Sequence, residues 1–166
     1  TQGPAYVTAT GGTITTSGDF KIHTFTGPGA FCVSCAGNAV GSNTVDYLVV
    51  AGGGGGGRGN TASNMSSGGG GGGGYRESPG TASGSYTVSP LGASPAVALP
   101  VSVQPYTVTV GAGGAAAPNA STRGSNGTNS TFSSITSTAG GGGGRGGSPY
   151  PGSGDPSING NPGGSG

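Results

Sequence analysis

Residues 45–57, VDYLVVAGGGGGG, decide the fold, because a short hydrophobic strand passes there directly into an uninterrupted glycine run. Two further runs, residues 68–74 and 140–144, follow along the chain. A glycine run is ordinarily a flexible linker, since glycine loses more backbone entropy on ordering than any other residue. The ordered alternative is a set of extended, left-handed threefold helices of the polyglycine II type. Such helices pack side by side through backbone hydrogen bonds, because no side chain separates them.

The composition argues for the ordered alternative. Glycine and proline supply 43 and 12 of the 166 residues, a share that is typical of low-complexity chains. However, the chain has only five Lys or Arg and four Asp or Glu residues, whereas disordered chains tend to carry high net charge. With six Tyr, four Phe and no Trp, a conventional core is thin. Backbone hydrogen bonding, or assembly with other chains, must therefore supply much of the stability.

Short strands are expected between the glycine runs. Alternating or β-branched segments predict strands at residues 13–16, 20–25, 30–34, 45–50, 85–88, 106–110 and 131–136. Prolines recur at five-residue intervals in residues 89–105, which forbids a helix and favours an extended surface segment. No segment predicts a helix of eight or more residues. The strand-then-glycine module recurs along the chain, as in stacked, non-catalytic architectures.

These patterns predict an all-β fold in which short β-strands combine with packed polyglycine II-like helices and essentially no α-helix. The expected division is a β-rich unit at residues 1–50, followed by a glycine-rich region with interspersed short strands at residues 51–166. A β-branched substitution inside a run, such as Gly71→Val, is expected to disrupt the packing, because a branched Cβ has no room between the helices.

A CxxC motif at Cys32 and Cys35 is the clearest candidate for chemistry. A redox CxxC needs a lowered thiol pKa, commonly from a helix N-terminus or nearby cations, and this motif lies in a β segment. A zinc site needs four ligands, and only His23 could be added. In a regular strand, residues three apart point to opposite faces, so a disulfide would need a turn or bulge. The context favours a structural disulfide or buried thiols over a metal or redox role.

The remaining residues offer no acid–base pair for catalysis. His23 is the only histidine and is expected to be a surface residue of a strand. The carboxylates are far apart in sequence, and no serine lies in a G-x-S-x-G elbow. We therefore expect no enzyme activity, no cofactor and no metal. The formal charge of +1 is not the footprint of a nucleic-acid-binding protein, and no apolar stretch approaches the ~20 residues of a transmembrane helix.

Four segments, in order, resemble the glycine-rich domain that is common in tail-fibre and virion-surface proteins of phages. They are residues 13–25 (TITTSGDFKIHTF), 45–57 (VDYLVVAGGGGGG), 105–114 (PYTVTVGAGG) and 124–144 (GSNGTNSTFSSITSTAGGGGG). The resemblance covers most of residues 10–145, and VDYLVVAGGGGG is its most specific element. It implies a structural role on a virion or outside the cell and transfers no catalytic residue. The CxxC motif and the proline-rich segment depart from the pattern.

Composition and resemblance together predict a non-enzymatic structural and adhesive module of a phage tail fibre or similar virion-surface fibre. The expected location is the virion surface or the extracellular space. Its partners would be copies of itself or other fibre proteins, together with a host-surface glycan or an outer-membrane receptor. Neither nucleic-acid binding nor membrane insertion is expected.

Contacts with partners are expected from three variable loops, at residues 58–67, 75–84 and 89–105. The candidate contact residues are Tyr75, Arg76, Tyr106 and Tyr150, because an aromatic ring or an arginine can stack on a sugar or pair with an anionic group. Two other functions stay open. One is a subunit of a self-assembling extracellular filament. The other is ice binding through Thr-x-Thr arrays, although the arrays in this sequence are too few for a convincing ice-binding face.

Overall fold

The computed structural model describes residues 2–59, 66–78, 97–146 and 158–163. The regular structure of these residues consists of β-strands without an α-helix, which confirms the predicted all-β class. The chain divides into two compact units. The β unit comprises Thr1–Val49, Arg76–Val110 and Thr131–Thr136, and the glycine bundle comprises Val50–Tyr75, Gly111–Ser130 and Ser137–Gly166. The predicted boundary near residue 50 therefore holds only for the first segment, because later parts of the chain return to pair with early strands.

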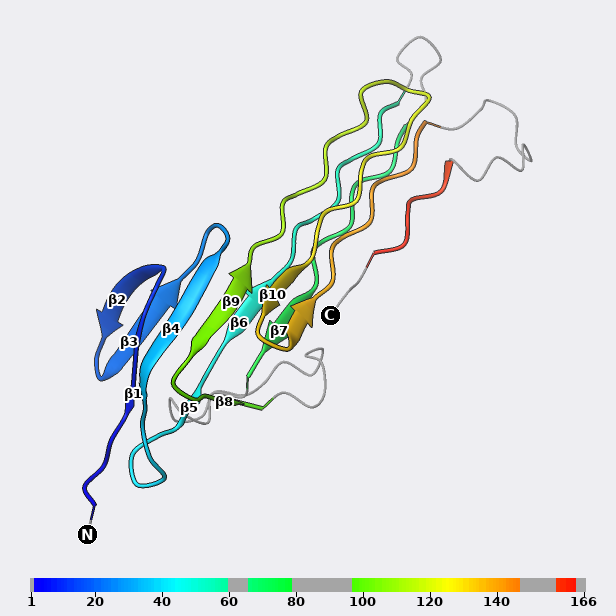
Figure 1. Ribbon diagram of the computed structural model, residues 1–166. Helices are drawn as coiled ribbons and strands as arrows, with labels where there is room; N and C mark the ends of the chain where they lie inside the picture. The colour runs from blue at the N-terminus through cyan, green and yellow to red at the C-terminus, as the bar shows by residue number, and fades with distance from the viewer. Residues whose placement is uncertain (1, 60–65, 79–96, 147–157, 164–166) are drawn as a thin grey trace. The chain divides into compact units, whose positions relative to one another are not determined.

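The largest sheet has five strands in the order β1-β4-β9-β10-β11 (Figure 1). Their bounds are Val7–Thr10 for β1, Gly29–Ala36 for β4, Pro105–Thr109 for β9, Ser130–Phe132 for β10 and Ile135–Ser137 for β11. The pairs β1–β4, β4–β9 and β9–β10 are antiparallel. Strand β9 lies beside β4 although a long stretch of chain separates them, so the sheet depends on long-range pairing.

Three two-stranded sheets complete the regular structure of the described residues. They pair β2 (Thr13–Ser17) with β3 (Phe20–Thr24), β5 (Thr44–Val45) with β8 (Leu99–Pro100), and β6 (Leu48–Val50) with β7 (Tyr75–Glu77). The β2–β3 hairpin was predicted, including its turn. Gly18, at the first position of that turn, has φ of 56°, which glycine adopts without steric cost.

Two predicted strands are wrong in their extent. Residues 45–50 do not form one strand, because Asp46 and Tyr47 instead bond to the buried Ser78. Ser78 N donates to Tyr47 O (3.0 Å), Tyr47 N donates to Ser78 Oγ (3.0 Å), and Ser78 Oγ donates to Asp46 Oδ1 (2.7 Å). Residues 131–136 form a hairpin rather than a strand, since Ser133 turns the chain with φ of 55°. Strand β1 was not predicted, and the strand predicted at residues 85–88 lies outside the described residues.

The core of the β unit lies on one face of the large sheet. In β9 the burial alternates, so that Tyr106 and Val108 point inward and their neighbours outward. The buried cluster consists of Ala9, Phe31, Val33, Val101, Tyr106 and Val108. Phe31 makes edge-to-face ring contacts with His23 (centroids 4.9 Å apart) and Phe132 (5.8 Å apart). Few large side chains take part, as the composition predicted.

Hydrogen bonds between neighbouring segments of the glycine bundle recur at every third residue. Gly54 N donates to Gly71 O at 2.8 Å, and three residues later Gly57 N donates to Gly68 O at 2.9 Å, so these two runs are antiparallel. The same spacing occurs in Gly68 N to Gly144 O, Gly71 N to Gly141 O, Gly124 N to Gly143 O, Gly127 N to Gly140 O, Gly140 N to Gly52 O and Gly143 N to Gly55 O. A β-strand repeats every second residue, whereas a polyproline II-type helix has three residues per turn.

The run at residues 140–144 has backbone neighbours on all sides. A Cβ atom on any of its five glycines would overlap a carbonyl oxygen of another segment. Those oxygens belong to Gly71, Asn161, Gly124, Gly68 and Ile158. The runs are thus ordered by close contact of backbones, and Figure 1 shows the bundle as a set of side-by-side segments without strand arrows. The left-handed polyglycine II conformation itself stays a prediction.

Candidate functional surfaces

Tyr106 was predicted to be a surface contact, and this is wrong. Its side chain is 8% exposed, because the alternation of β9 points it into the core beside Val108. Its hydroxyl receives a hydrogen bond from Ser102 N (2.7 Å) and lies 3.2 Å from Ser102 Oγ. Hydrogen bonds with the side chains of Gln104 and Ser102 lower the pKa of the Tyr106 hydroxyl from its usual 10.0. Tyr106 therefore belongs to the core and fixes the turn before β9.

Replacing Tyr106 with Phe is expected to lower the free energy of unfolding by about 1–2 kcal/mol, because Ser102 N–H loses its acceptor in a partly buried turn. Urea denaturation followed by circular dichroism would measure the change. The matched control is Tyr6→Phe, since Tyr6 is 64% exposed and should change stability by less than about 0.5 kcal/mol. Equal effects of the two substitutions would contradict the role of the Tyr106 hydroxyl.

The other predicted contact residues are spread over different parts of the chain. Tyr75 begins β7 directly after a glycine run and is 36% exposed. Arg76, the next residue, is half-buried. Tyr150 lies outside the described residues, as do most of the predicted contact loops at residues 58–67, 75–84 and 89–105. The described residues therefore do not bring the predicted contacts together into one site.

Cys32 and Cys35 lie on the same face of the large sheet, because a bulge interrupts the pairing of β1 with β4. Cys35 pairs with Thr8 and Cys32 with Thr10, and the register shifts between them. Both cysteines are free; Cys32 is half-buried and Cys35 is exposed. The predicted disulfide is thus not formed, and Cys35 is not a buried thiol. Three steps of about 3.3 Å along a strand exceed the Cα separation of at most about 6.8 Å that a disulfide allows.

Thiol labelling should distinguish the two cysteines. In the native chain without reductant, 5,5′-dithiobis(2-nitrobenzoate) should react rapidly with the exposed Cys35 and more slowly with the half-buried Cys32. Cys35→Ser should remove the rapid phase, and Cys32→Ser should leave it in place. Thiols that react only after reduction would instead show a disulfide.

His23 lies in strand β3, as predicted, and is half-buried rather than fully exposed. Its ring contacts Phe31 edge-to-face, and its Nδ1 lies 2.8 Å from the carbonyl oxygen of Gly11. Among the described residues, no three His, Cys, Asp or Glu side chains gather as metal ligands would. The same part of the chain contains no helix of the length and hydropathy needed to cross a membrane.

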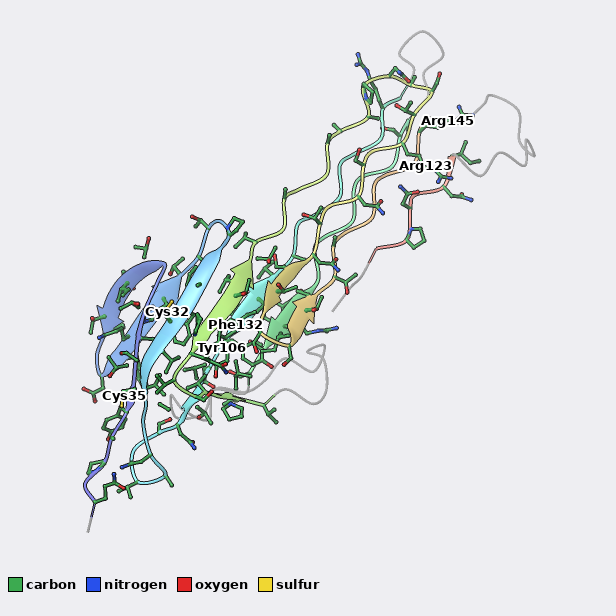
Figure 2. The ribbon with its side chains drawn as sticks, viewed as in Figure 1. Cys32, Cys35, Tyr106, Arg123, Phe132 and Arg145 are labelled. Atoms are coloured by element: carbon green, nitrogen blue, oxygen red, sulfur yellow. The ribbon has the colours of Figure 1, made fainter. Side chains whose placement is uncertain are left out.

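Three arginines converge at one end of the glycine bundle, and the sequence analysis did not predict this. Gly146 N, next to Arg145, donates to the carbonyl oxygen of Arg58 (3.1 Å), which places those two segments side by side. Gly124 N, next to Arg123, donates to Gly143 O (2.9 Å) and brings the third arginine to the same end. Figure 2 shows Arg123 and Arg145 close together there. The one sequence signal was the position of Arg58 and Arg145 just after glycine runs.

Comparison with known proteins identifies the family of the chain. Residues 26–166 match the family described as "Glycine-rich domain". The chain belongs to this glycine-rich domain family. No curated protein and no solved structure matches it.

The match to the glycine-rich domain begins after the β2–β3 hairpin, so it leaves out β1 as well. Yet β1 pairs with β4 over four residue pairs and contributes Ala9 to the core. In this chain the folded β unit therefore extends beyond the matched region. The family supports the glycine-rich part of the resemblance and by itself carries no function.

Proposed function

We propose that the chain is a non-enzymatic structural and adhesive module of a phage tail fibre or similar virion-surface fibre. The observation that carries the proposal is the glycine bundle, whose segments are joined by backbone hydrogen bonds at every third residue. The period fits polyglycine II-like helices, and we propose that conformation for the runs. Such a bundle needs no large side chains, which leaves the turns between segments free to vary in sequence. Such an architecture suits a stiff fibre that contacts its partners through variable loops.

The proposal places the chain on the virion surface or outside the cell. Its partners would be copies of itself or other fibre proteins, and a host-surface glycan or outer-membrane receptor, without nucleic acid and without membrane insertion. Apolar side chains left exposed in the β unit could bury area against a neighbouring copy. Among them are Ile14, Phe20, Ile22, Val40 and Leu48, each at least 44% exposed. A homo-oligomer is therefore part of the proposal.

The alternative is a subunit of a self-assembling extracellular filament, which the same exposed side chains also favour. Ice binding gains less support. Thr8 and Thr10 lie on one exposed face of the sheet with Thr107 and Thr109. However, Cys32 pairs with Thr10 on that face, and Ala30 pairs with Thr107. Cys32 and Ala30 of β4 therefore lie between the threonines of β1 and those of β9, and the threonine array is not continuous.

Two measurements test the proposal. Sedimentation of the purified chain should give a finite oligomer for a fibre module, and negative-stain images should show particles of one size. Species that lengthen with concentration would support the filament instead, and a stable monomer would leave a self-contained tip module. Gold-labelled antibodies against the chain should decorate fibres on native phage particles. Particles without label would overturn the virion assignment.

A further inference from the structure

The glycine run at residues 68–74 lies at the surface of the glycine bundle and is bonded on one side only. Gly68 and Gly71 use both of their backbone groups, because they donate to the run 140–144 and accept from the run 52–57. The residues between them leave their N–H and C=O groups without a hydrogen-bond partner in the described chain; these residues are Gly69, Gly70, Gly72 and Gly73. A surface row of unpaired backbone groups is a template for pairing with another chain.

Two glycines of this run are not required by packing within the chain. A Cβ on Gly69 or Gly72 would meet no atom within 4 Å, and both residues are exposed. Alanine at such a position would reduce the backbone entropy that is lost on folding. Another exposed segment of the bundle does have alanine at its exposed positions, namely Ala112, Ala115 and Ala116. Close approach of an external backbone would account for glycine at residues 69 and 72.

The run at residues 52–57 is open on the same side of the bundle. Four segments bond to it, and each of them bonds to the next in the order 68–74, 140–144, 124–128 and 111–117. They therefore form an arc around residues 52–57, and the described residues of the two end segments do not bond to each other. The arc leaves one side of the central run uncovered between residues 68–74 and 111–117.

The uncovered glycines of the two runs lie opposite each other. In their antiparallel pairing, Gly53 is level with Gly72, and Gly56 is level with Gly69. A Cβ on Gly53 would lie 3.4 Å from its nearest neighbour, the carbonyl oxygen of Gly71, and a Cβ on Gly56 would meet no atom within 4 Å. The N–H groups of Gly53 and Gly56 also have no hydrogen-bond partner among the described residues. We call these four glycines the open face.

The partner that fits the open face is a second copy of the chain. Segments inside the bundle approach so closely that a Cβ on Gly70 or Gly73 would overlap a carbonyl oxygen of the run 52–57 or of the preceding Ala51. A peptide with ordinary side chains cannot reach that distance, whereas another glycine run can. The open face also carries both donors and acceptors, so an antiparallel copy can repeat the pairing already present within the chain.

We propose that two copies of the chain pack open face against open face, by antiparallel backbone contact about a twofold axis. The inference rests on the homo-oligomer of the proposed function and assigns a contact to the glycine bundle, whereas the exposed apolar side chains named above belong to the β unit. A seven-residue run is about 20 Å long, so the contact is smaller than a standard interface of about 1,200 Å² and the dimer should be weak. Repetition along a fibre would add such contacts together.

Sedimentation equilibrium of the full chain between about 1 µM and about 1 mM would measure this association. The double variant Gly69→Ala/Gly72→Ala should fold, because both methyl groups enter open space. It should weaken dimerisation by at least about tenfold, because the methyl groups hold the two backbones apart. The control Gly3→Ala/Gly27→Ala adds the same methyl groups at open positions of the β unit and should change association by no more than about twofold.

Circular dichroism would first establish that both double variants fold. If the open-face variant does not fold, the single substitution Gly72→Ala replaces it, with Gly27→Ala as its control. A monomer at every concentration, or equal losses in the open-face and control variants, would overturn the inference. An oligomer that persists in the open-face variant but dissociates in Phe20→Ala would also overturn it, and would leave the proposed homo-oligomer standing through the β unit. Antibody labelling of native fibres does not depend on these results, so the open face can fail while the fibre assignment stands.

Discussion

Alanine at Gly73 is expected to unfold the glycine bundle, whereas alanine at the adjacent Gly72 is expected to leave it folded. A Cβ on Gly73 would overlap the carbonyl oxygen of Ala51, and a Cβ on Gly72 would meet no atom within 4 Å. The overlap separates two segments that are joined by Ala51 N to Gly74 O at 3.0 Å. Overpacking by backbone displacement should cost about 3 kcal/mol or more. At Gly72, alanine restricts the unfolded chain and should stabilise by up to about 1 kcal/mol.

Hydrogen–deuterium exchange of the glycine amides would measure this difference, because opening of the bundle exposes the amides of neighbouring runs. The same contrast should recur three residues earlier, with Gly69→Ala tolerated and Gly70→Ala not tolerated. At Gly71 a Cβ would lie 3.2 Å from Gly141 N, which is tight. Gly71→Val is therefore still expected to disrupt the packing of the bundle, although a side chain has even less room at Gly70 and Gly73. Tolerance that alternates every second residue would contradict the threefold backbone.

Replacing Phe31 with alanine is expected to lower the free energy of unfolding of the β unit by about 3–5 kcal/mol. Phe31 is 7% exposed and contacts the rings of both His23 and Phe132, so its loss leaves a cavity at the centre of the core. Because the core contains few large side chains, the residues around position 31 cannot fill that cavity. A loss of this size approaches the whole stability of a small unit, and the variant should be largely unfolded at 37 °C.

Phe20→Ala is the matched control, since Phe20 is 46% exposed on the β2–β3 hairpin. Its removal should cost less than about 1 kcal/mol in the isolated chain. Urea denaturation monitored by tyrosine fluorescence would compare the two variants. A loss at Phe20 as large as that at Phe31 would show that the hairpin face is buried, as it would be in an oligomer. Tolerance of Phe31→Ala would contradict the core described for the β unit.

Features that depend on neighbouring residues could be predicted from the sequence. The all-β class follows from β-branched alternation, and the β2–β3 hairpin follows from its glycine turn. The glycine runs indicated ordered packing, because they alternate with strands in a chain of low charge. The absence of a catalytic site was also inferred from composition, and it stays a prediction. For the strands and the hairpin, the deciding interactions lie within a few residues along the chain.

Tertiary structure decided the features that depend on distant partners. Tyr106 became a core residue because β9 pairs with β4 in one register, and a shift of one residue would have exposed it. The strand predicted at residues 45–50 was divided by Ser78, a residue far along the chain. Arg123 joined Arg58 and Arg145 only because hydrogen bonds fix the relative register of separate segments. A glycine run has no side chains to specify its neighbours, so its sequence can predict close packing without determining which segments meet.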